Sequence, residues 1–437
     1  MLLRFGMENM LSFRDYQEIS LVVPKQSNQG AIRGLLHVKG VKEPVVPAVG
    51  IYGANASGKS NLLACLSQFI FAIINSHSRP EMPSIRNPFR LDNTSINAPS
   101  RMECDVMVEG TRYQYGFRLD GHRVLEEWLY AFPFGARHRT LFHRNTEESE
   151  TFYFGPHMKG NNHVVKEQTR EDSLFLSTAG INNHKQLHPL WKFFCQRIKI
   201  DNQINTRTSL FHDINKLEAN SMLREFVVSF LREADTGISD IQLHDVPEEI
   251  KNKIKTHFNH AILNDKKHRE AVERFPPTEK DISLQHQAGS EKLTLPYHLE
   301  SRGTQTMLGI AIKIHQTLEQ GGLLVVDELE SGLHPYAAKR LLELFQDSAT
   351  NPNQAQILFA THDSYLMTGL APAQIWLCEK NVQGATEIYP LTATQLRKGE
   401  NLEHGYLKGR YGGVPYMGPI ENLLHPTNFD RNEQTAS

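Results

Sequence analysis

The segment Gly53–Ser60, which reads GANASGKS, constrains this chain more than any other. It fits the pattern G-x-x-x-x-G-K-[S/T], follows an apolar run that ends at Tyr52, and precedes a stretch with helical spacing of apolar residues. Glycines let such a loop point several backbone N–H groups at phosphate oxygens, and the positive end of the following helix favours the same anion. The segment therefore predicts a strand, a phosphate-binding loop (P-loop) and a helix in succession.

Residue types within this loop suit a nucleoside triphosphate bound with Mg²⁺. Lys59 supplies a positive charge to the β- and γ-phosphates, and the Ser60 hydroxyl can hold the metal ion. We expect ATP and Mg²⁺ as cofactors. The residues expected to contact the nucleotide are Gly53, Asn55, Ala56, Ser57, Gly58, Lys59, Ser60 and Asn61.

A second motif, LLVVDE at residues 323–328, supplies the acids that this chemistry requires. An apolar strand that ends in Asp327 would place its carboxylate near the Mg²⁺, so Ser60 and Asp327 are the predicted metal ligands. The adjacent Glu328 can polarise the attacking water, which makes it a predicted catalytic residue.

Two further segments fit the same site. Residues 300–305, ESRGTQ, stand before a helical stripe of apolar residues, where the Ser301 hydroxyl and free N–H groups form an anion-binding helix start that includes Gly303. FATHD at residues 359–363 follows another apolar run, and His362 is the second predicted catalytic residue, as a sensor of the γ-phosphate. Alone, the Ser301 segment would be only a good helix cap.

Periodicity indicates an α/β protein with several parts. Alternating apolar residues predict an antiparallel sheet over 102–130, and continuous apolar runs at 322–326 and 356–360 predict buried parallel strands. Residues 185–280 are predicted to be mainly helical, with apolar stripes at 222–231 and 250–262. We divide the chain into an N-terminal part with the antiparallel subdomain (1–180), a helical insertion (181–282), a C-terminal part (283–420) and a polar tail (421–437).

Composition limits the partners and the compartment. The net charge of −2 supplies no general attraction for nucleic acid, so a nucleic-acid site would need a local patch. Four cysteines without paired spacing fit a reducing compartment, and no apolar run approaches the roughly 20 residues that span a bilayer. We expect a soluble cytoplasmic protein without a membrane segment. The candidate basic patches are Arg137–Arg139 and the residues Lys251, Lys253, Lys255, Lys266, Lys267 and Arg269.

Taken together, the motifs resemble an ABC-type P-loop ATPase head of the branch that includes SMC, Rad50 and OLD proteins. GANASGKS matches Walker A, SRGTQ resembles the signature motif, LLVVDE matches Walker B, ESGLHP resembles the D-loop and FATHD the switch histidine segment. More narrowly, residues 1–65 and 283–415 resemble the AAA15 (AAA_21) family and its RloA-like ATPases. The resemblance implies that Ser301 of one chain closes over ATP held by Lys59 of another, in a head-to-tail homodimer or a higher homo-oligomer. The family's Q-loop glutamine has no assigned counterpart here, although Asn87 lies in a similar region.

The resemblance also implies a role. Relatives act as components of phage-defence systems, and about 60 residues without a DxD motif follow the last predicted core strand, so we expect a separately encoded nuclease or toxin as the effector. The alternative is a DNA-repair ATPase of RecF or Rad50 type acting directly on nucleic acid. A transporter's nucleotide-binding subunit is the third possibility.

Overall fold

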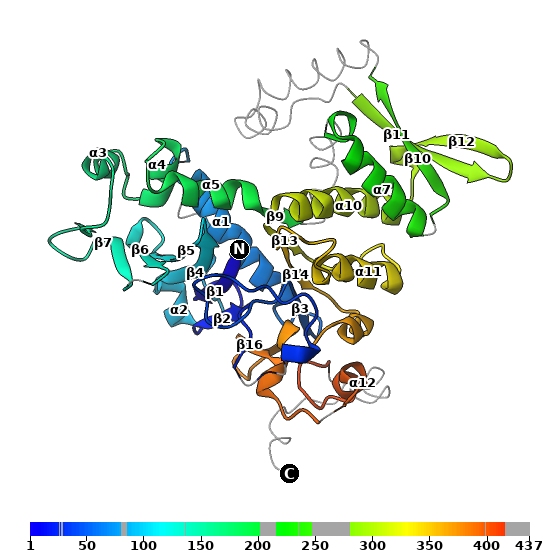
Figure 1. Ribbon diagram of the computed structural model, residues 1–437. Coiled ribbons are helices and arrows are strands. Elements are labelled where there is room, and N and C mark those ends of the chain that lie inside the picture. The colour runs from blue at the N-terminus through cyan, green and yellow to red at the C-terminus, as the bar shows by residue number, and fades with distance from the viewer. Residues whose placement is uncertain are drawn as a thin grey trace.

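The computed structural model describes residues 1–25, 27, 29–79, 85–135, 137–201, 216–234, 236–246, 280–397 and 399–415 (Figure 1). The strands are β1 (Leu2–Glu8), β2 (Gln17–Ser20), β3 (Ala48–Gly53), β4 (Ser100–Val108), β5 (Thr111–Leu119), β6 (Val124–Pro133), β7 (Arg139–Asn145), β8 (Phe152–Phe154), β9 (Ile198–Asp201), β10 (Ile238–Asp245), β11 (Lys280–Ala288), β12 (Glu291–Pro296), β13 (Leu323–Val326), β14 (Gln356–Ala360), β15 (Ile375–Lys380) and β16 (Thr386–Pro390). The main helices are α1 (Lys59–Asn75), α2 (Asn93–Asn97), α3 (Asn162–Glu167), α4 (Phe175–Ile181), α5 (His188–Arg197), α7 (Ser221–Glu233), α10 (Arg302–Gln320), α11 (Pro335–Gln346) and α12 (Leu402–Leu407), with the 3-10 helix η5 (Ser364–Gly369).

The central sheet has six strands in the order β16-β15-β3-β14-β13-β9. All neighbouring pairs are parallel except β15 with β16. The carboxyl ends of β3, β14 and β13 therefore lie side by side at one edge, where the three segments that follow these strands meet. The apolar runs that predicted β13 and β14 are buried along their whole length, as strands covered on both faces should be.

Alternate residues of this sheet pack into two separate hydrophobic cores. On one face, Val49, Ile51 and Val325 join the core that contains α1, α4 and α5. On the other face, Ala48 and Leu324 join the core that contains α7, α10 and α11. The sheet thus separates two helical layers, and both layers help to fix the positions of the strand ends.

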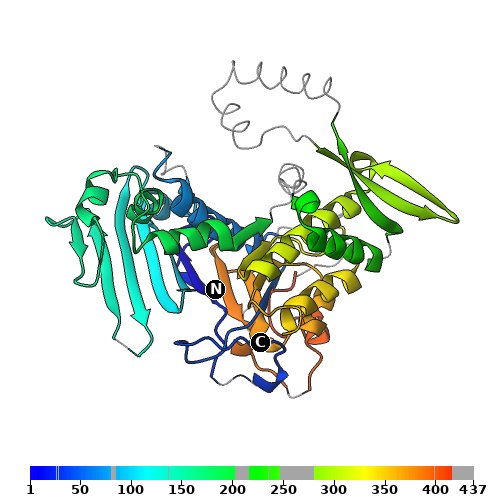
Figure 2. The same cartoon turned by 45° about the horizontal axis from the view of Figure 1, so that its top comes forward.

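A second sheet of seven antiparallel strands lies beyond α1, in the order β2-β1-β4-β5-β6-β7-β8 (Figure 2). It confirms the predicted antiparallel strands, and Gly110 makes the turn between β4 and β5 with a φ of 74°. α1 packs on this sheet through Phe69, whose ring stacks on Phe117 with centroids 5.4 Å apart and meets Phe5 edge-on at 5.5 Å. Because α1 also touches the central sheet, it joins both sheets into one head.

The region predicted to be mainly helical contains two strands as well. α5 and α7 are helical, and Leu223, Val227 and Leu231 of the first apolar stripe are buried, but Met222 is 65% exposed. β9 pairs with β13, and β10 pairs with β11. The prediction of helix was wrong for these strands because β9 has only four residues directly after a helix, and β10 is stabilised by a partner distant in sequence. The stripe at 250–262 and the tail at 421–437 lie outside the described residues.

Strands β10, β11 and β12 form a small antiparallel sheet that extends away from the rest of the head (Figure 1). β12 is exposed over its first four residues. Among the residues described, no helix combines the length and apolar character needed to cross a membrane. The division of the chain into domains stays a prediction.

Candidate nucleotide site

The P-loop connects β3 to α1 at the carboxyl edge of the central sheet. Its backbone is left-handed at Ala56, with a φ of 61°, and at Gly58, with a φ of 117°. The Ser57 N–H donates to the Ala54 carbonyl at 3.2 Å, so the loop turns on itself before the helix begins. A Cβ at position 58 would overlap the side chain of Thr386, which is why glycine is needed there. Successive N–H groups in such a turn form a concave anion site.

Lys59 is the first residue of α1 and is 5% exposed. Its Nζ donates to the carbonyl oxygens of Gly53 at 2.8 Å and Ala54 at 2.9 Å, so the ammonium group lies across the loop. Burial lowers the pKa of Lys59, and nearby groups, led by Cys378, oppose this shift only in part. An anion in the loop would favour the charged form of this lysine.

The predicted metal ligands lie beside each other. Ser60 Oγ donates to Asp327 Oδ1 at 3.1 Å, across a sequence separation of 267 positions. Asp327 follows β13 directly, and only β14 stands between β13 and β3 in the sheet. The contact therefore follows from the strand order, and it places two oxygen atoms of the kind that Mg²⁺ prefers next to Lys59.

Glu328, a predicted catalytic residue, has an uncommon backbone conformation. Its φ is 53°, in the left-handed region, which costs a non-glycine residue energy. The Ser331 N–H donates to the Glu328 carbonyl at 2.8 Å and closes the turn. The Glu328 side chain is exposed immediately after Asp327, at the edge of the sheet that carries the P-loop.

A neighbouring acid, Glu330, joins this turn to the segment that carries His362. The two Glu330 oxygens accept hydrogen bonds from the Thr361 hydroxyl at 2.6 Å and from the His362 N–H at 2.7 Å. His362 is exposed and follows β14, which lies between β3 and β13. The sequence did not assign a role to Glu330, although it begins the ESGLHP segment.

Ser301 caps α10, as its sequence context predicts: its Oγ accepts a hydrogen bond from the Thr304 N–H at 3.1 Å. Gly303 packs against Gly332 so closely that a Cβ on Gly303 would come within 2.9 Å of the Gly332 carbonyl oxygen. Within the described residues, no hydrogen bond joins Ser301 to the P-loop of its own chain. The signature segment, residues 301–305, thus packs against the turn that follows the Walker B strand. Ser301 itself is exposed.

A hydroxyl cluster supports the P-loop from outside. The Thr386 hydroxyl lies 2.8 Å from the Ser57 carbonyl oxygen and 2.8 Å from Ser12 Oγ, and Asn61 Nδ2 donates to the same Ser12 Oγ at 2.8 Å. Thr386 and Ser57 are 329 positions apart. Sequence reasoning missed Thr386 and Ser12 because no local pattern marks a contact between such distant residues.

A cleft of about 280 Å³ opens beside this cluster. Asn61 lines it from α1, and Asn87 lines it from the segment that precedes α2. Arg90 and Lys380 add two positive charges to its wall. The cleft therefore lies beside the P-loop, because Asn61 and Ser12 of the hydroxyl cluster both line it.

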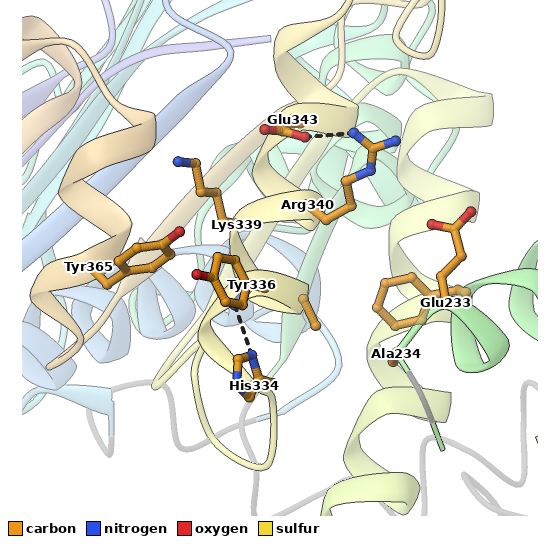
Figure 3. Close-up of a pocket in the computed structure, with 10 residues that line it drawn as sticks. Glu233, Ala234, His334, Tyr336, Lys339, Arg340, Glu343 and Tyr365 are labelled. Carbon is orange, nitrogen blue, oxygen red and sulfur yellow. Dashed lines mark hydrogen bonds and ion pairs between the residues drawn. The ribbon is translucent and has the colours of Figure 1, made fainter. Parts of the chain in front are cut away.

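A larger groove of about 830 Å³ lies between α7 and α11, and neither P-loop nor Walker B residues line it (Figure 3). Tyr336 is 68% exposed there, and its ring stacks on His334 with centroids 5.3 Å apart. Lys339 makes a cation–π contact with Tyr365, its Nζ lying 5.3 Å from the ring centroid. The groove includes the end of the ESGLHP segment but none of the predicted site residues.

Of the two basic patches predicted from the sequence, only the one at Arg137–Arg139 lies within the described residues. Arg137 and His138 are exposed in the connection between β6 and β7, which belongs to the antiparallel sheet and not to the edge that carries the P-loop. The cluster from Lys251 to Arg269 lies outside the described residues. Neither patch contributes a described residue to the candidate site.

Three segments far apart in the sequence thus meet at one sheet edge: the P-loop, the acids after β13 and the histidine segment after β14. With the capped helix α10 and the separate antiparallel sheet, they define the protein as a P-loop ATPase head of the ABC type. The chain belongs to the AAA_21 family, described as "AAA domain, putative AbiEii toxin, Type IV TA system", whose sequence model matches residues 48–368. The predicted family is confirmed. No curated protein sequence matches the chain.

Several solved structures are similar to this fold at low sequence identity. An SMC head bound to the C-winged helix domain of ScpA is 12% identical, with a TM-score of 0.47 over 89% of this chain and 96% of that one. The SMC head domain from Thermotoga maritima is 13% identical, with a TM-score of 0.38 over 89% and 98%. An Smc head with an extended coiled coil, bound to the C-terminal domain of ScpA, derived from Pyrococcus furiosus, is 12% identical, with a TM-score of 0.41 over 90% and 97%.

Proposed function

We propose that this protein binds ATP with Mg²⁺ and hydrolyses it at composite sites between two copies arranged head to tail. We further propose that this cycle controls a separately encoded nuclease or toxin in an anti-phage defence complex. The observation that carries the ATPase proposal is the 3.1 Å contact between Ser60 and Asp327, beside the buried Lys59. It unites Walker A and Walker B at one place, as metal-assisted phosphoryl transfer requires.

The residues present fit Mg²⁺ and ATP. Ser60 and Asp327 would hold the metal ion, which neutralises charge on the β- and γ-phosphates when bound. Lys59 exchanges its bonds to the loop carbonyls for bonds to phosphate oxygens. Glu328 orients the attacking water and accepts its proton, and His362 contacts the γ-phosphate side of the site.

The arrangement of the signature segment supports a site shared between two copies. Ser301 is exposed at the start of α10, and its hydroxyl has its described hydrogen bonds only with Thr304. A helix start with an exposed serine can bind an anion supplied by another molecule. In the proposed head-to-tail dimer, Ser301 and Gly303 of one copy complete the phosphate site held by Lys59 of the other.

The defence role rests on the family to which the chain belongs. The family's description names a putative toxin and a toxin–antitoxin system, which supports a role in a system of this kind. Such an effector would be a separate protein in this proposal. Isolation of the assembled complex from cells, followed by identification of a nuclease or toxin subunit, tests this part.

The test of the ATPase proposal uses two variants with opposite defects. Lys59→Ala should weaken ATP binding by about tenfold or more, because it removes a charge-assisted contact with the phosphates. Glu328→Gln should keep the affinity for ATP but lower kcat on the order of 10²–10³-fold, because it removes the proton acceptor. Fluorescent ATP binding and phosphate release measure the two effects, and size-exclusion chromatography with ATP should show Glu328→Gln as a stable dimer.

Glu148→Gln is the matched control, since it makes the same chemical change on the surface between β7 and β8, where Glu148 accepts a hydrogen bond from the nearby Asn145. It should bind and hydrolyse ATP as the wild type does. A Glu328→Gln protein that hydrolyses ATP at the normal rate would remove Glu328 from the mechanism. Wild-type protein that fails to bind ATP would contradict the proposal as a whole.

A further inference from the structure

Two buried polar atoms lie close to the residues Thr361–Tyr365, which we call the switch segment, and have no hydrogen-bond partner among the described residues. They are the hydroxyl of Tyr52 and Oδ2 of Asp363. Tyr52 is only 1% exposed and lies in β3 immediately before the P-loop. Because buried polar atoms in proteins are nearly always paired, an unpaired donor and an unpaired acceptor in the same region need an explanation.

A backbone hydrogen bond joins the switch segment to β3 beside Tyr52: the Thr361 N–H donates to the carbonyl of Ile51, the residue before Tyr52, at 3.1 Å. Burial raises the pKa of Tyr52 well above its ordinary value, and the negative charge of Asp363 is the next largest cause, ahead of Glu330. The negative charges of the switch segment and of the turn that holds it thus favour the protonated hydroxyl of Tyr52. A phenol hydroxyl next to a carboxylate oxygen is a natural donor for it.

Within the switch segment, one of the two Asp363 carboxylate oxygens accepts a hydrogen bond. Oδ1 of Asp363 accepts a hydrogen bond from the Tyr365 N–H at 2.9 Å, and the Asp363 N–H donates to the Thr361 hydroxyl at 3.0 Å. Oδ2 is left for another donor. Asp363 directly follows His362, so any hydrogen bond made by Oδ2 also fixes the position of the histidine.

α12 holds the same region from the outside. Ser364 Oγ donates to Glu403 at 3.2 Å, and the ring of Tyr406 packs edge-on against Tyr52 with centroids 6.2 Å apart. Burial raises the pKa of Tyr406 to about 12, although a hydrogen bond from the Gly53 backbone opposes the shift. Tyr52, the P-loop and the switch segment are thus parts of one packed cluster, in which a movement of one changes the others.

We propose that Tyr52 and Asp363 are positioning residues that connect ATP binding to the switch histidine. When ATP occupies the P-loop, the switch segment shifts so that the Tyr52 hydroxyl donates to Asp363 Oδ2, and this bond holds His362 toward the γ-phosphate. One hydrogen bond satisfies both buried atoms, which stabilises the shifted position. The inference rests on the proposed ATPase function and gives a role to two residues that had none in it, Tyr52 before the P-loop and Asp363 after the histidine.

The experiment compares Tyr52→Phe, Asp363→Asn and the double variant. In Asp363→Asn, the new amide would keep an oxygen for the Tyr365 N–H but present an NH₂ group, which cannot accept, to Tyr52. Each single variant should lower kcat by about tenfold or more with the KM for ATP changed less than about twofold, because the switch histidine is misplaced while the P-loop is intact. The double variant should be no slower than the slower single variant, because both remove the same hydrogen bond.

Tyr411→Phe is the matched control, since it removes another buried hydroxyl that lacks a partner among the described residues, from a tyrosine that is 4% exposed. Its kcat should equal that of the wild type. A normal kcat for Tyr52→Phe, or losses that multiply in the double variant, would overturn the inference while wild-type ATPase activity upholds the proposed function. Wild-type protein without ATP binding would overturn both. Phenylalanine fills the space of Tyr52, so this variant provides the test even if Asp363→Asn folds poorly.

Discussion

At the scale of single residues, the conformation of the P-loop depends on a side chain of β16, an edge strand of the central sheet. The Thr386 hydroxyl contacts the Ser57 carbonyl oxygen and Ser12, and its side chain occupies the space that a Cβ at position 58 would need. The loop conformation is therefore set partly by β16, which forms the edge of the central sheet next to β15. An ATP-binding loop that is held in this way is preorganised before the nucleotide arrives.

This contact makes a prediction for Thr386→Val, which keeps the side-chain shape but removes the hydroxyl. The Ser57 carbonyl then loses a partner, and the free energy of unfolding should fall by about 1–3 kcal/mol. Because the loop becomes less ordered, the Kd for ATP should rise by roughly tenfold, measured with a fluorescent ATP analogue. Thermal or urea unfolding measures the loss of stability.

Thr394→Val provides the comparison, because the Thr394 hydroxyl donates to the nearby Leu391 carbonyl at 2.7 Å, away from the P-loop. It should leave the Kd for ATP unchanged. Equal ATP affinity for Thr386→Val and wild type would show that β16 does not organise the loop.

At the scale of elements, the small sheet β10–β12 is connected to the start of α10. His286 of β11 bonds to Glu300 through Nε2 and Oε1 at 2.6 Å, and the Glu300 side chain is only 5% exposed. Gln305 Nε2 donates to the Glu300 carbonyl at 3.1 Å, which brings the first turn of α10 into the same arrangement. The sheet that extends from the head thus supports the residue immediately before Ser301.

His286→Ala should therefore disturb the signature segment and leave the P-loop intact. The buried Glu300 carboxylate loses its partner, and kcat should fall by roughly tenfold, as expected for the loss of a hydrogen bond to a charged group. The affinity of the isolated chain for ATP should not change, because in the proposed dimer Ser301 acts on the nucleotide held by the other copy. Steady-state ATPase assays and ATP-binding titrations measure the two quantities.

His244→Ala on β10 is the corresponding control, since His244 is exposed and lies in the same small sheet. Its kcat should match that of the wild type. If His286→Ala weakened ATP binding as strongly as it slowed hydrolysis, the sheet would act on the P-loop of its own chain, contrary to the proposal.

At the scale of the whole molecule, the two cores hold the predicted catalytic groups at one edge of the central sheet. The core with α1 supports the P-loop, and the core with α10 and α11 supports the signature and Walker B segments. Ser301 is exposed on the second of these parts. A head-to-tail pair of such molecules would contain two equivalent composite sites.

Mixing of two inactive variants tests this arrangement. Lys59→Ala and Ser301→Ala should each show little ATPase activity alone. In a mixed dimer, one of the two sites contains an intact Lys59 and an intact Ser301, so an equimolar mixture should recover about a quarter of the wild-type activity with random pairing. Phosphate release after the subunits have been unfolded and refolded together measures the recovery.

A mixture of Lys59→Ala with Asp327→Ala is the negative control. Both residues belong to the chain that holds the nucleotide, so each of the two sites in a mixed dimer carries one of the two defects. It should stay inactive. The absence of any recovery in the Lys59→Ala and Ser301→Ala mixture would refute composite sites.

The sequence alone determined the local parts of this protein. The P-loop, the apolar strand before Asp327 and the capped helix after Ser301 were predicted from contiguous patterns, and the structure contains β3, α1, β13 and α10 at those positions. Such motifs can be read locally because backbone conformation and strand burial depend on neighbouring residues. The roles assigned to these residues in ATP chemistry stay predictions.

Only the tertiary structure decided which distant residues support the motifs. Strand order brings Thr386 against Ser57, Glu330 against the switch segment, and Thr361 against Ile51. Short strands such as β9 exist because β13 provides a backbone partner. These contacts leave no periodic signal, since hydrogen bonds and packing between remote segments arise only once the sheet has brought them together. The physical reason is that local propensity selects elements, whereas pairing and burial select their neighbours.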